Sequence, residues 1–180
     1  MGALGASLAT MVANLSSHKK GWDDRWQEFS DWAAKGQQYK NELLKLVDAD
    51  TAAFNKIMEA FALPKSTAEE KAHRSEAIQL ATKFAIEIPF KVMQTAAASM
   101  EVAKAMVRIG NPNSITDAGV GALCIRTAVM GAFMNVRINA TGYDNKVFVN
   151  EIVEKGKALQ DATIAKEAEI LRIVNAKIGL

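Results

Sequence analysis

One long helical pattern decides the fold, and its centre is residues 43–61, LLKLVDADTAAFNKIMEAF. A helix that packs against neighbours repeats apolar residues at alternating steps of four and three. The positions that follow this spacing are Leu43, Val47, Asp50, Phe54, Ile57 and Phe61. Five of the six are apolar and one is an aspartate. The stretch therefore predicts a long helix with a carboxylate in its apolar seam.

The surrounding sequence is also helical. The central pattern extends over about residues 22–61 and stops at Leu63-Pro64, with Gly36 as a candidate interruption. Residues 2–17 predict an earlier helix with one face of small side chains that another helix can approach closely. That face consists of Gly2, Gly5, Ala6, Ala9 and Ala13.

Three more helices are predicted after Pro64. The first covers about residues 67–110, where Thr67 and Glu70 have the spacing of a capping box and Pro89 predicts a kink. Turn-forming residues 110–114 separate it from a helix over about 114–139, for which Ser114 and Asp117 have cap spacing. The last covers about 144–177. Long helices joined by short turns predict an all-α, antiparallel up-and-down bundle of about five helices, with residues 1–180 as a single domain.

Composition excludes several classes of function. The chain has 22 basic and 20 acidic residues, so it lacks the basic surface that binds nucleic acid. No run approaches about 18 uninterrupted apolar residues, which argues against a membrane protein. The lone Cys124 lies in an apolar run, which predicts that its thiol is buried in the core. A single cysteine that cannot form an intramolecular disulfide suits a reducing compartment, so we expect the protein in the cytoplasm. His18 and His73 are too far apart for metal-ligand spacing, so no metal site is expected.

Asp50 is the residue with the most chemical interest. Asp48 points about 200° away around the same helix and predicts a surface charge beside Lys45. A buried carboxylate must be paired, hydrogen-bonded, facing a water-filled cleft, or kept protonated by a raised pKa. A carboxyl group with a raised pKa suits general acid and base catalysis. The pattern by itself favours the other role, a structural aspartate bonded to a facing helix or subunit.

Asn135 and Asn139 are one turn apart on an apolar face of the fourth predicted helix. Taken alone, they predict hydrogen bonds between helices or a C-terminal cap rather than contacts with a ligand.

Four segments together resemble one family. Residues 46–54, LVDADTAAF, and 63–71, LPKSTAEEK, are similar to the folate cyclodeaminase/cyclohydrolase family, and most closely to the cyclodeaminase domain of formimidoyltransferase-cyclodeaminase. The similarity continues through residues 113–119, NSITDAG, and 131–139, GAFMNVRIN. It spans nearly the whole chain, and the two-aspartate motif is specific in combination with the Leu-Pro-Lys turn.

The resemblance implies an ammonia-lyase of the formimidoyltetrahydrofolate cyclodeaminase type. Such an enzyme converts 5-formimidoyltetrahydrofolate to 5,10-methenyltetrahydrofolate with release of ammonia, a late step of histidine breakdown. It requires no metal or redox cofactor. The family assembles into homodimers or larger rings, and a formimidoyltransferase is a possible partner. The alternatives are a methenyltetrahydrofolate cyclohydrolase and a non-catalytic helical oligomerisation module.

The resemblance also assigns residues. Asp50 matches the expected catalytic aspartate, which would move a proton between the two folate nitrogens. Asp117, Asn135 and Asn139 lie in the matching motifs and are the expected folate contacts, with Lys65 neutralising the glutamate tail. The family carries a Pro-Gly-Gly-Gly-Ser segment ahead of the stretch that matches residues 1–6. The given sequence starts after it, and amides of that segment are expected to help bind the folate.

Overall fold

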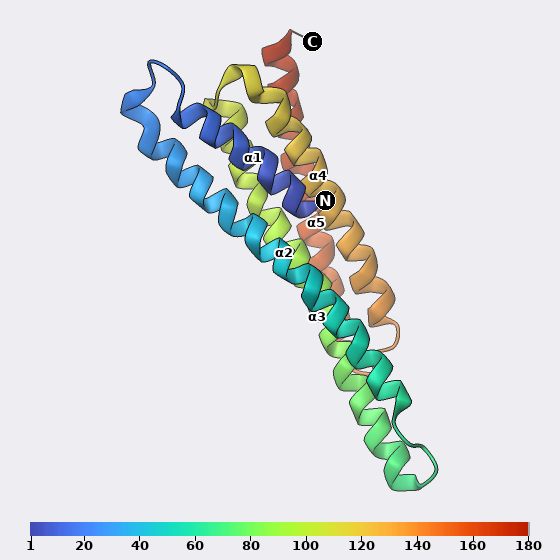
Figure 1. Ribbon diagram of the computed structural model, residues 1–180. Helices are drawn as coiled ribbons and strands as arrows, with labels where there is room; N and C mark the ends of the chain where they lie inside the picture. The colour runs from blue at the N-terminus through green and yellow to red at the C-terminus, as the bar shows by residue number, and fades with distance from the viewer. Residues whose placement is uncertain (180) are drawn as a thin grey trace.

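The computed structural model describes residues 1–179, which form helices and turns with no strand (Figure 1). The long helices are α1 (Gly2–Ser17), α2 (Trp26–Ala62), α3 (Ala68–Ile109), α4 (Ile115–Ala140) and α5 (Lys146–Ile178). Two single 3-10 turns, Asp23–Arg25 and Pro112–Ser114, precede α2 and α4. The predicted all-α bundle of five long helices is confirmed.

Most of the predicted helix ends are confirmed, and the exceptions have local causes. Thr67 Oγ1 accepts the Glu70 N–H at 3.1 Å, and the Glu70 carboxylate accepts the Thr67 N–H at 3.0 Å, so the capping box is present. Ser114 precedes α4, but its side chain makes no capping hydrogen bond, so that predicted cap is wrong. Asn111 instead caps the 3-10 turn by accepting the Asn113 N–H.

Gly36 does not interrupt α2, because the helix is continuous from Trp26 to Ala62. Its role is in packing. A Cβ atom at this position would lie 2.2 Å from Thr10 Oγ1 of α1, closer than two such atoms can approach.

α1 lies between α2 and α4, while α3 and α5 pack behind them (Figure 1). The predicted small-residue face of α1 is confirmed, since all five of its residues are buried. At its centre, a Cβ on Gly5 would lie 2.6 Å from the carbonyl oxygen of Gly121 in α4. A Cβ on Gly121 would in turn lie 3.0 Å from the Gly5 carbonyl oxygen, so the two backbones are in contact.

The core is one hydrophobic cluster. Cys124 is buried in α4, as predicted. The helix α4 with its preceding turn, Pro112–Ala140, is long and apolar enough to cross a membrane by length and composition, with an 18-residue window of mean hydropathy 1.4. Half of that window is buried inside the bundle. Its apolar character is accounted for by packing against α1, α3 and α5.

The predicted seam of α2 is wrong in its details. The fully buried positions in the second half of α2 are Leu43, Leu46, Ala53 and Ala60. Val47 and Phe54 of the predicted seam are each 62% exposed, and Asp50 is exposed too. α2 carries two parallel apolar stripes about 100° apart, and the predicted seam took members of both.

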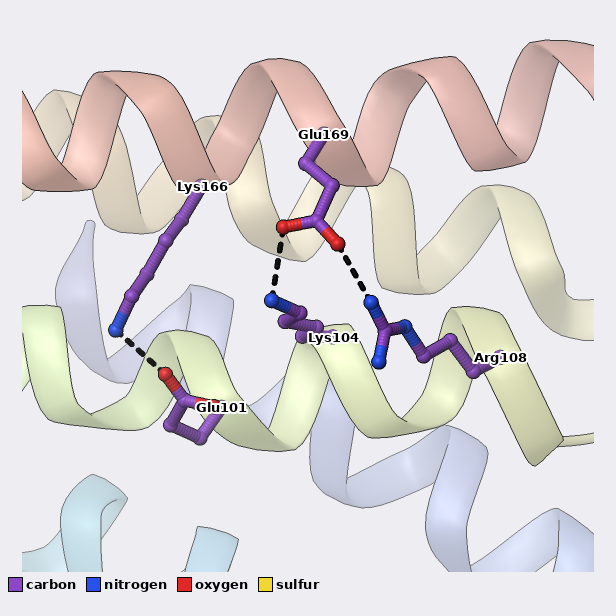
Figure 2. Close-up of polar contacts among 5 residues, drawn as sticks. All are labelled: Glu101, Lys104, Arg108, Lys166 and Glu169. Carbon is purple, nitrogen blue, oxygen red and sulfur yellow. Dashed lines mark hydrogen bonds and ion pairs between the residues drawn. The ribbon is translucent and has the colours of Figure 1, made fainter.

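Charged side chains cross between α3 and α5 (Figure 2). The Glu169 carboxylate accepts hydrogen bonds from Lys104 Nζ at 2.8 Å and from Arg108 Nη2 at 2.6 Å. Lys166 Nζ donates to Glu101 at 2.5 Å. These hydrogen bonds, from Lys104 and Lys166 respectively, lower the pKa of Glu169 and of Glu101 below the ordinary value. Ion pairs of this kind fix α5 along α3.

We expect the α3–α5 ion pairs to make stability depend on pH. A carboxylate whose pKa is lower in the folded state stabilises it above the unfolded pKa of about 4.3, and this stabilisation is lost as the pH falls through the folded pKa. Glu169→Gln should therefore lower the urea midpoint at pH 7 and have a smaller effect at pH 3. The control is Asp161→Asn, because the partner of Asp161, Lys157, lies on α5 itself. Equal effects of the two substitutions at pH 7 would contradict this role.

The contact between α1 and α4 predicts opposite effects of two glycine substitutions. Gly5→Ala should destabilise the fold by about 1–3 kcal/mol, because the added methyl group overpacks the Gly121 backbone. Gly131→Ala, in the same α4 but with open space around its Cβ, should stabilise it by about 0.5–1 kcal/mol through helix propensity. Thermal unfolding followed by circular dichroism measures both. A neutral Gly5→Ala would show that the helices do not touch there.

Candidate active site

A cleft of about 350 Å³ opens where α1 begins, between the middle of α2 and the middle of α4. Pro89 and Val92 of α3 form its floor together with Leu43 and Leu46 of α2. The polar side chains that line it are Asp50, Thr51 and Asn135. It is thus an apolar hollow with a few polar groups, the usual composition of a small-molecule site.

Among residues 1–179, Asp50 is the only ionisable side chain that lines this cleft. It lies on the exposed side of α2, and no hydrogen bond or ion pair to its carboxylate is formed within residues 1–179. The predicted structural role, an aspartate bonded to a facing helix of the same chain, is therefore wrong. Of the four possibilities that the sequence left for Asp50, the structure shows a carboxylate that faces a cleft. Asp48 is exposed beyond the cleft, as predicted.

The N-terminus of α1 points into the same cleft, at mid-height of the bundle (Figure 1). Met1 precedes the helix and, in the described part of the chain, supplies no side-chain cap. The first N–H groups of a helix have no acceptor within it. Those of Gly2 and Ala3, which line the cleft, therefore remain available to a ligand.

Asn135 and Asn139 of α4 have different surroundings. Asn135 is exposed and lines the cleft with Asp50. Asn139 donates from Nδ2 to the carbonyl oxygen of Ala85 in α3 at 2.8 Å. That carbonyl is four residues before Pro89, which has no N–H to bond it. Asn139 replaces the missing helix hydrogen bond, so it holds in place the part of α3 that forms the cleft floor.

The other predicted folate contacts lie away from the cleft. Asp117 is in the first turn of α4, and Asn135 follows 18 positions later, about 27 Å further along the helix. Lys65 is in the turn between α2 and α3, beyond the end of α2 at Ala62. The structure thus brings together Asp50 and Asn135 but not Asp117 or Lys65.

Sequence reasoning missed Pro89, Thr51 and the N-terminus of α1 as parts of this site. A proline inside a helix is a signal, because it leaves one carbonyl without a donor and invites a side chain from another helix. The N-terminus of α1 has a signal too, because no capping residue precedes the helix and its first N–H groups lack a side-chain acceptor. Only the fold shows that both features meet at Asp50.

A larger hollow of about 580 Å³ lies between the end of α4 and the start of α5. Its charged side chains are Arg137 and Lys146, and no carboxylate or histidine of the described residues lines it. It therefore lacks a group that can accept a proton near neutral pH. The Asp50 cleft is therefore the better candidate for a reaction in which protons are transferred.

The hydrogen bond between Asn139 and Ala85 can be tested through its dependence on Pro89. Asn139→Leu should destabilise the fold by about 1–3 kcal/mol, because the Ala85 carbonyl is left without a donor. In a Pro89→Ala background the N–H of residue 89 can bond Ala85, so the same substitution should cost less than half as much. Urea unfolding of the four proteins in this cycle measures the coupling. Strict additivity would contradict the explanation.

Comparison with known proteins identifies the family of this chain. The family model described as formiminotransferase-cyclodeaminase matches residues 1–158. Methenyltetrahydrofolate cyclohydrolase of Methylorubrum extorquens is 32% identical over 178 residues, which cover 99% of this chain and 86% of that protein. Formimidoyltransferase-cyclodeaminase of Gallus gallus is 31% identical over 175 residues, 97% of this chain. The chain spans only 32% of that longer protein.

A solved structure of a related protein has the same fold. The crystal structure of formiminotetrahydrofolate cyclodeaminase from Thermotoga maritima superposes with a TM-score of 0.78 at 25% identity, over 95% of this chain and 83% of that one. The fold, the family model and the relatives all agree. The chain therefore belongs to the formiminotransferase-cyclodeaminase domain family, whose members act on folate derivatives.

Proposed function

We propose that this chain is a formimidoyltetrahydrofolate cyclodeaminase, which acts on the one-carbon unit between N5 and N10 of tetrahydrofolate. The observation that carries the proposal is one ionisable side chain, Asp50, in an otherwise apolar cleft that also holds an amide and free helix N–H groups. The similarity to the Thermotoga maritima cyclodeaminase along nearly the whole chain supports it.

The reaction needs one proton to move between two nitrogens. N10 attacks the carbon of the formimidoyl group on N5, whose terminal nitrogen is protonated, and a new C–N bond closes the ring. The N10 proton passes to the Asp50 carboxylate and from there to the departing nitrogen. The bond from carbon to that nitrogen then breaks, ammonia leaves, and the positive charge stays on the methenyl product. A single carboxylate serves both transfers, and the ring closure is intramolecular once the substrate is held in position.

The neighbours of Asp50 supply binding. Asn135 can donate to and accept from the pterin ring, and the free N–H groups of Gly2 and Ala3 can bind a carbonyl oxygen or the carboxylate of the folate. Leu43, Leu46 and Pro89 provide the apolar surface that the flat ring packs against. In this scheme Asn139 is a positioning residue. Its bond to Ala85 holds the cleft floor and does not touch substrate.

A second candidate is methenyltetrahydrofolate cyclohydrolase. It is favoured by the Methylorubrum extorquens relative, of which this chain covers 86%. In that reaction water adds to the methenyl carbon of the same folate ring system and the ring opens. Asp50 would accept one proton from the water and deliver it to the ring nitrogen whose bond to the carbon breaks. The other proton of the water is released to solvent as the formyl carbonyl forms. The same cleft therefore suits either activity, and the two differ in substrate.

Two assays separate the candidates. With 5-formimidoyltetrahydrofolate, a cyclodeaminase raises the methenyl absorbance and releases ammonia in equal amounts. With 5,10-methenyltetrahydrofolate at neutral pH, a cyclohydrolase lowers the same absorbance faster than buffer does. If neither rate exceeds the uncatalysed one, the chain is not an enzyme of this kind, and a non-catalytic helical module becomes the better account. An active cyclodeaminase implies a formimidoyltransferase as the source of its substrate, in the cytoplasm.

Asp50→Asn should lower kcat by about 10²–10⁴-fold, because the amide keeps the size of the side chain but cannot carry the proton. Asp48→Asn is the matched control. It removes the same charge two residues away, outside the cleft, and should change kcat less than twofold. Circular dichroism establishes that both variants keep their helix content. Full activity of Asp50→Asn would exclude the proposed role.

A further inference from the structure

A groove of about 450 Å³ lies along the contact between α1 and α2, and we call it the α1–α2 groove. Polar side chains from both helices line it: Ser7, Thr10, Asn14, His18, Gln37 and Lys40. No carboxylate of the described residues lines it. The groove therefore offers a cation and several hydrogen-bonding groups to a ligand, whereas the Asp50 cleft offers a carboxylate.

The α1–α2 groove continues the Asp50 cleft by one helical turn on each helix. On α1, Ala3 lines the cleft and Ser7 lines the groove, and Ser7 Oγ donates to the Ala3 carbonyl oxygen at 2.7 Å. On α2, Leu43 lines the cleft and Lys40 lines the groove. The two helices lie side by side and run antiparallel (Figure 1), so both steps lead in the same direction, away from Asp50.

Lys40 is the cation that the groove presents. It is half-buried and forms no hydrogen bond or ion pair within residues 1–179. Two other lysines lie near the cleft but do not face the groove. Lys91 is paired with Glu42 at 2.7 Å. Lys45 points about 140° away from Asp50 around α2. The α1–α2 groove thus holds a cation whose charge no carboxylate of the described chain neutralises.

The length of a folate matches the spacing between Asp50 and Lys40. A tetrahydrofolate carries on N10 a p-aminobenzoyl-glutamate tail with two carboxylates, which extends about 10 Å from N10 at covalent bond lengths of about 1.5 Å. Lys40 precedes Asp50 by ten residues, about 15 Å along α2. Its extended side chain spans roughly 6 Å by the same bond lengths. The tail and the lysine side chain together therefore cover this distance.

We infer that the α1–α2 groove takes the p-aminobenzoyl-glutamate tail of the substrate and that Lys40 binds a tail carboxylate, an inference that rests on the proposed function. With N10 beside Asp50, the tail leaves the cleft between Ala3 and Leu43. The benzoyl carbonyl oxygen then lies at the free N–H groups of the first turn of α1. Lys40 Nζ donates a charge-assisted hydrogen bond to the glutamate. Lys40 takes the role expected of Lys65.

The other routes out of the cleft suit an anionic tail less well. Arg137, in the hollow between α4 and α5, lies about 200° around α4 from Asn135, so a tail would have to cross the helix to reach it. Towards the α2–α3 hairpin, Lys56 Nζ lies over the Phe84 ring at 4.2 Å. The carboxylate of Glu59 lines the same hollow as Lys56 and would repel the tail. Only the α1–α2 groove leads from the cleft to a lysine without such an obstacle.

Isothermal titration calorimetry with 5-formyltetrahydrofolate tests the role of Lys40. Lys40→Gln should raise Kd about tenfold, because it removes a hydrogen bond between charged groups. Lys40→Arg keeps the charge and should stay within threefold of the wild type. The matched control is Lys45→Gln, which removes the same charge closer to Asp50 but outside the groove, and should change Kd less than twofold. An unchanged Kd for Lys40→Gln, or equal losses in Lys40→Gln and Lys45→Gln, would overturn the inference.

A change in the ligand tests the same contact from the other side. The dimethyl ester of 5-formyltetrahydrofolate keeps the tail and removes its charges. The wild type should bind the ester about tenfold more weakly than the parent compound, whereas Lys40→Gln should bind the two with equal Kd, as expected for two groups that interact directly. If the ester loses as much affinity in Lys40→Gln as in the wild type, the tail carboxylate is bound elsewhere and the inference is wrong.

Turnover separates the groove from the proposed function, because binding of 5-formyltetrahydrofolate requires no reaction. In an active enzyme, Lys40→Gln should raise KM and change kcat less than twofold, since the bond to the tail is the same in the ground state and the transition state. Affinity that depends on Lys40 without activity on either folate would reject the proposed function and support the groove. Activity together with affinity that is independent of Lys40 would do the reverse. No binding at millimolar ligand would reject both.

Discussion

The arrangement of this bundle depends on the contact between the backbones of α1 and α4 at Gly5 and Gly121. A Cβ on Gly5 would collide with the carbonyl oxygen of Gly121, and a Cβ on Gly121 would lie unusually close to the carbonyl oxygen of Gly5. The same closeness is seen where Gly36 of α2 faces Thr10. Because α1 lies this deep between α2 and α4, its first turn reaches the middle of the bundle. The free N–H groups of that turn then share a cleft with Asp50 and Asn135.

Asp50 owes its position to the two apolar stripes of α2. One stripe packs on the core through Leu46 and Ala53, and the other is exposed at Val47 and Phe54. A side chain between them lies at the edge of both, and Asp50 in this position lines the cleft. This explains why Asp50 follows the spacing of apolar residues in the sequence and is nevertheless exposed in the structure. The cleft floor needs its own support, which Asn139 provides at the carbonyl that Pro89 leaves free.

Much of the fold could be predicted from the sequence, because its signals are local. Helix ends follow from Leu63-Pro64 and from the Thr67 capping box, and the small face of α1 follows from spacing. The burial of α2 could not be predicted, since periodicity gives the spacing of apolar residues but not which neighbour they meet. The pairing of Asn139 with Ala85 joins residues that are distant in sequence, so only the fold shows it. Asp117 and Asn135 lie in separate matching motifs, and the predicted helix over about 114–139 already places them about 27 Å apart along its axis.

The central claim is that a tetrahydrofolate binds at the cleft between the start of α1, α2 and α4. The most direct measurement is a backbone amide NMR titration with 5-formyltetrahydrofolate, a stable folate that carries its one-carbon unit on N5. The account predicts saturable shift changes concentrated at residues 2–4, around Asp50 and around Asn135. Changes concentrated instead in the hollow around Arg137 and Lys146, or no saturable change at millimolar ligand, would contradict it.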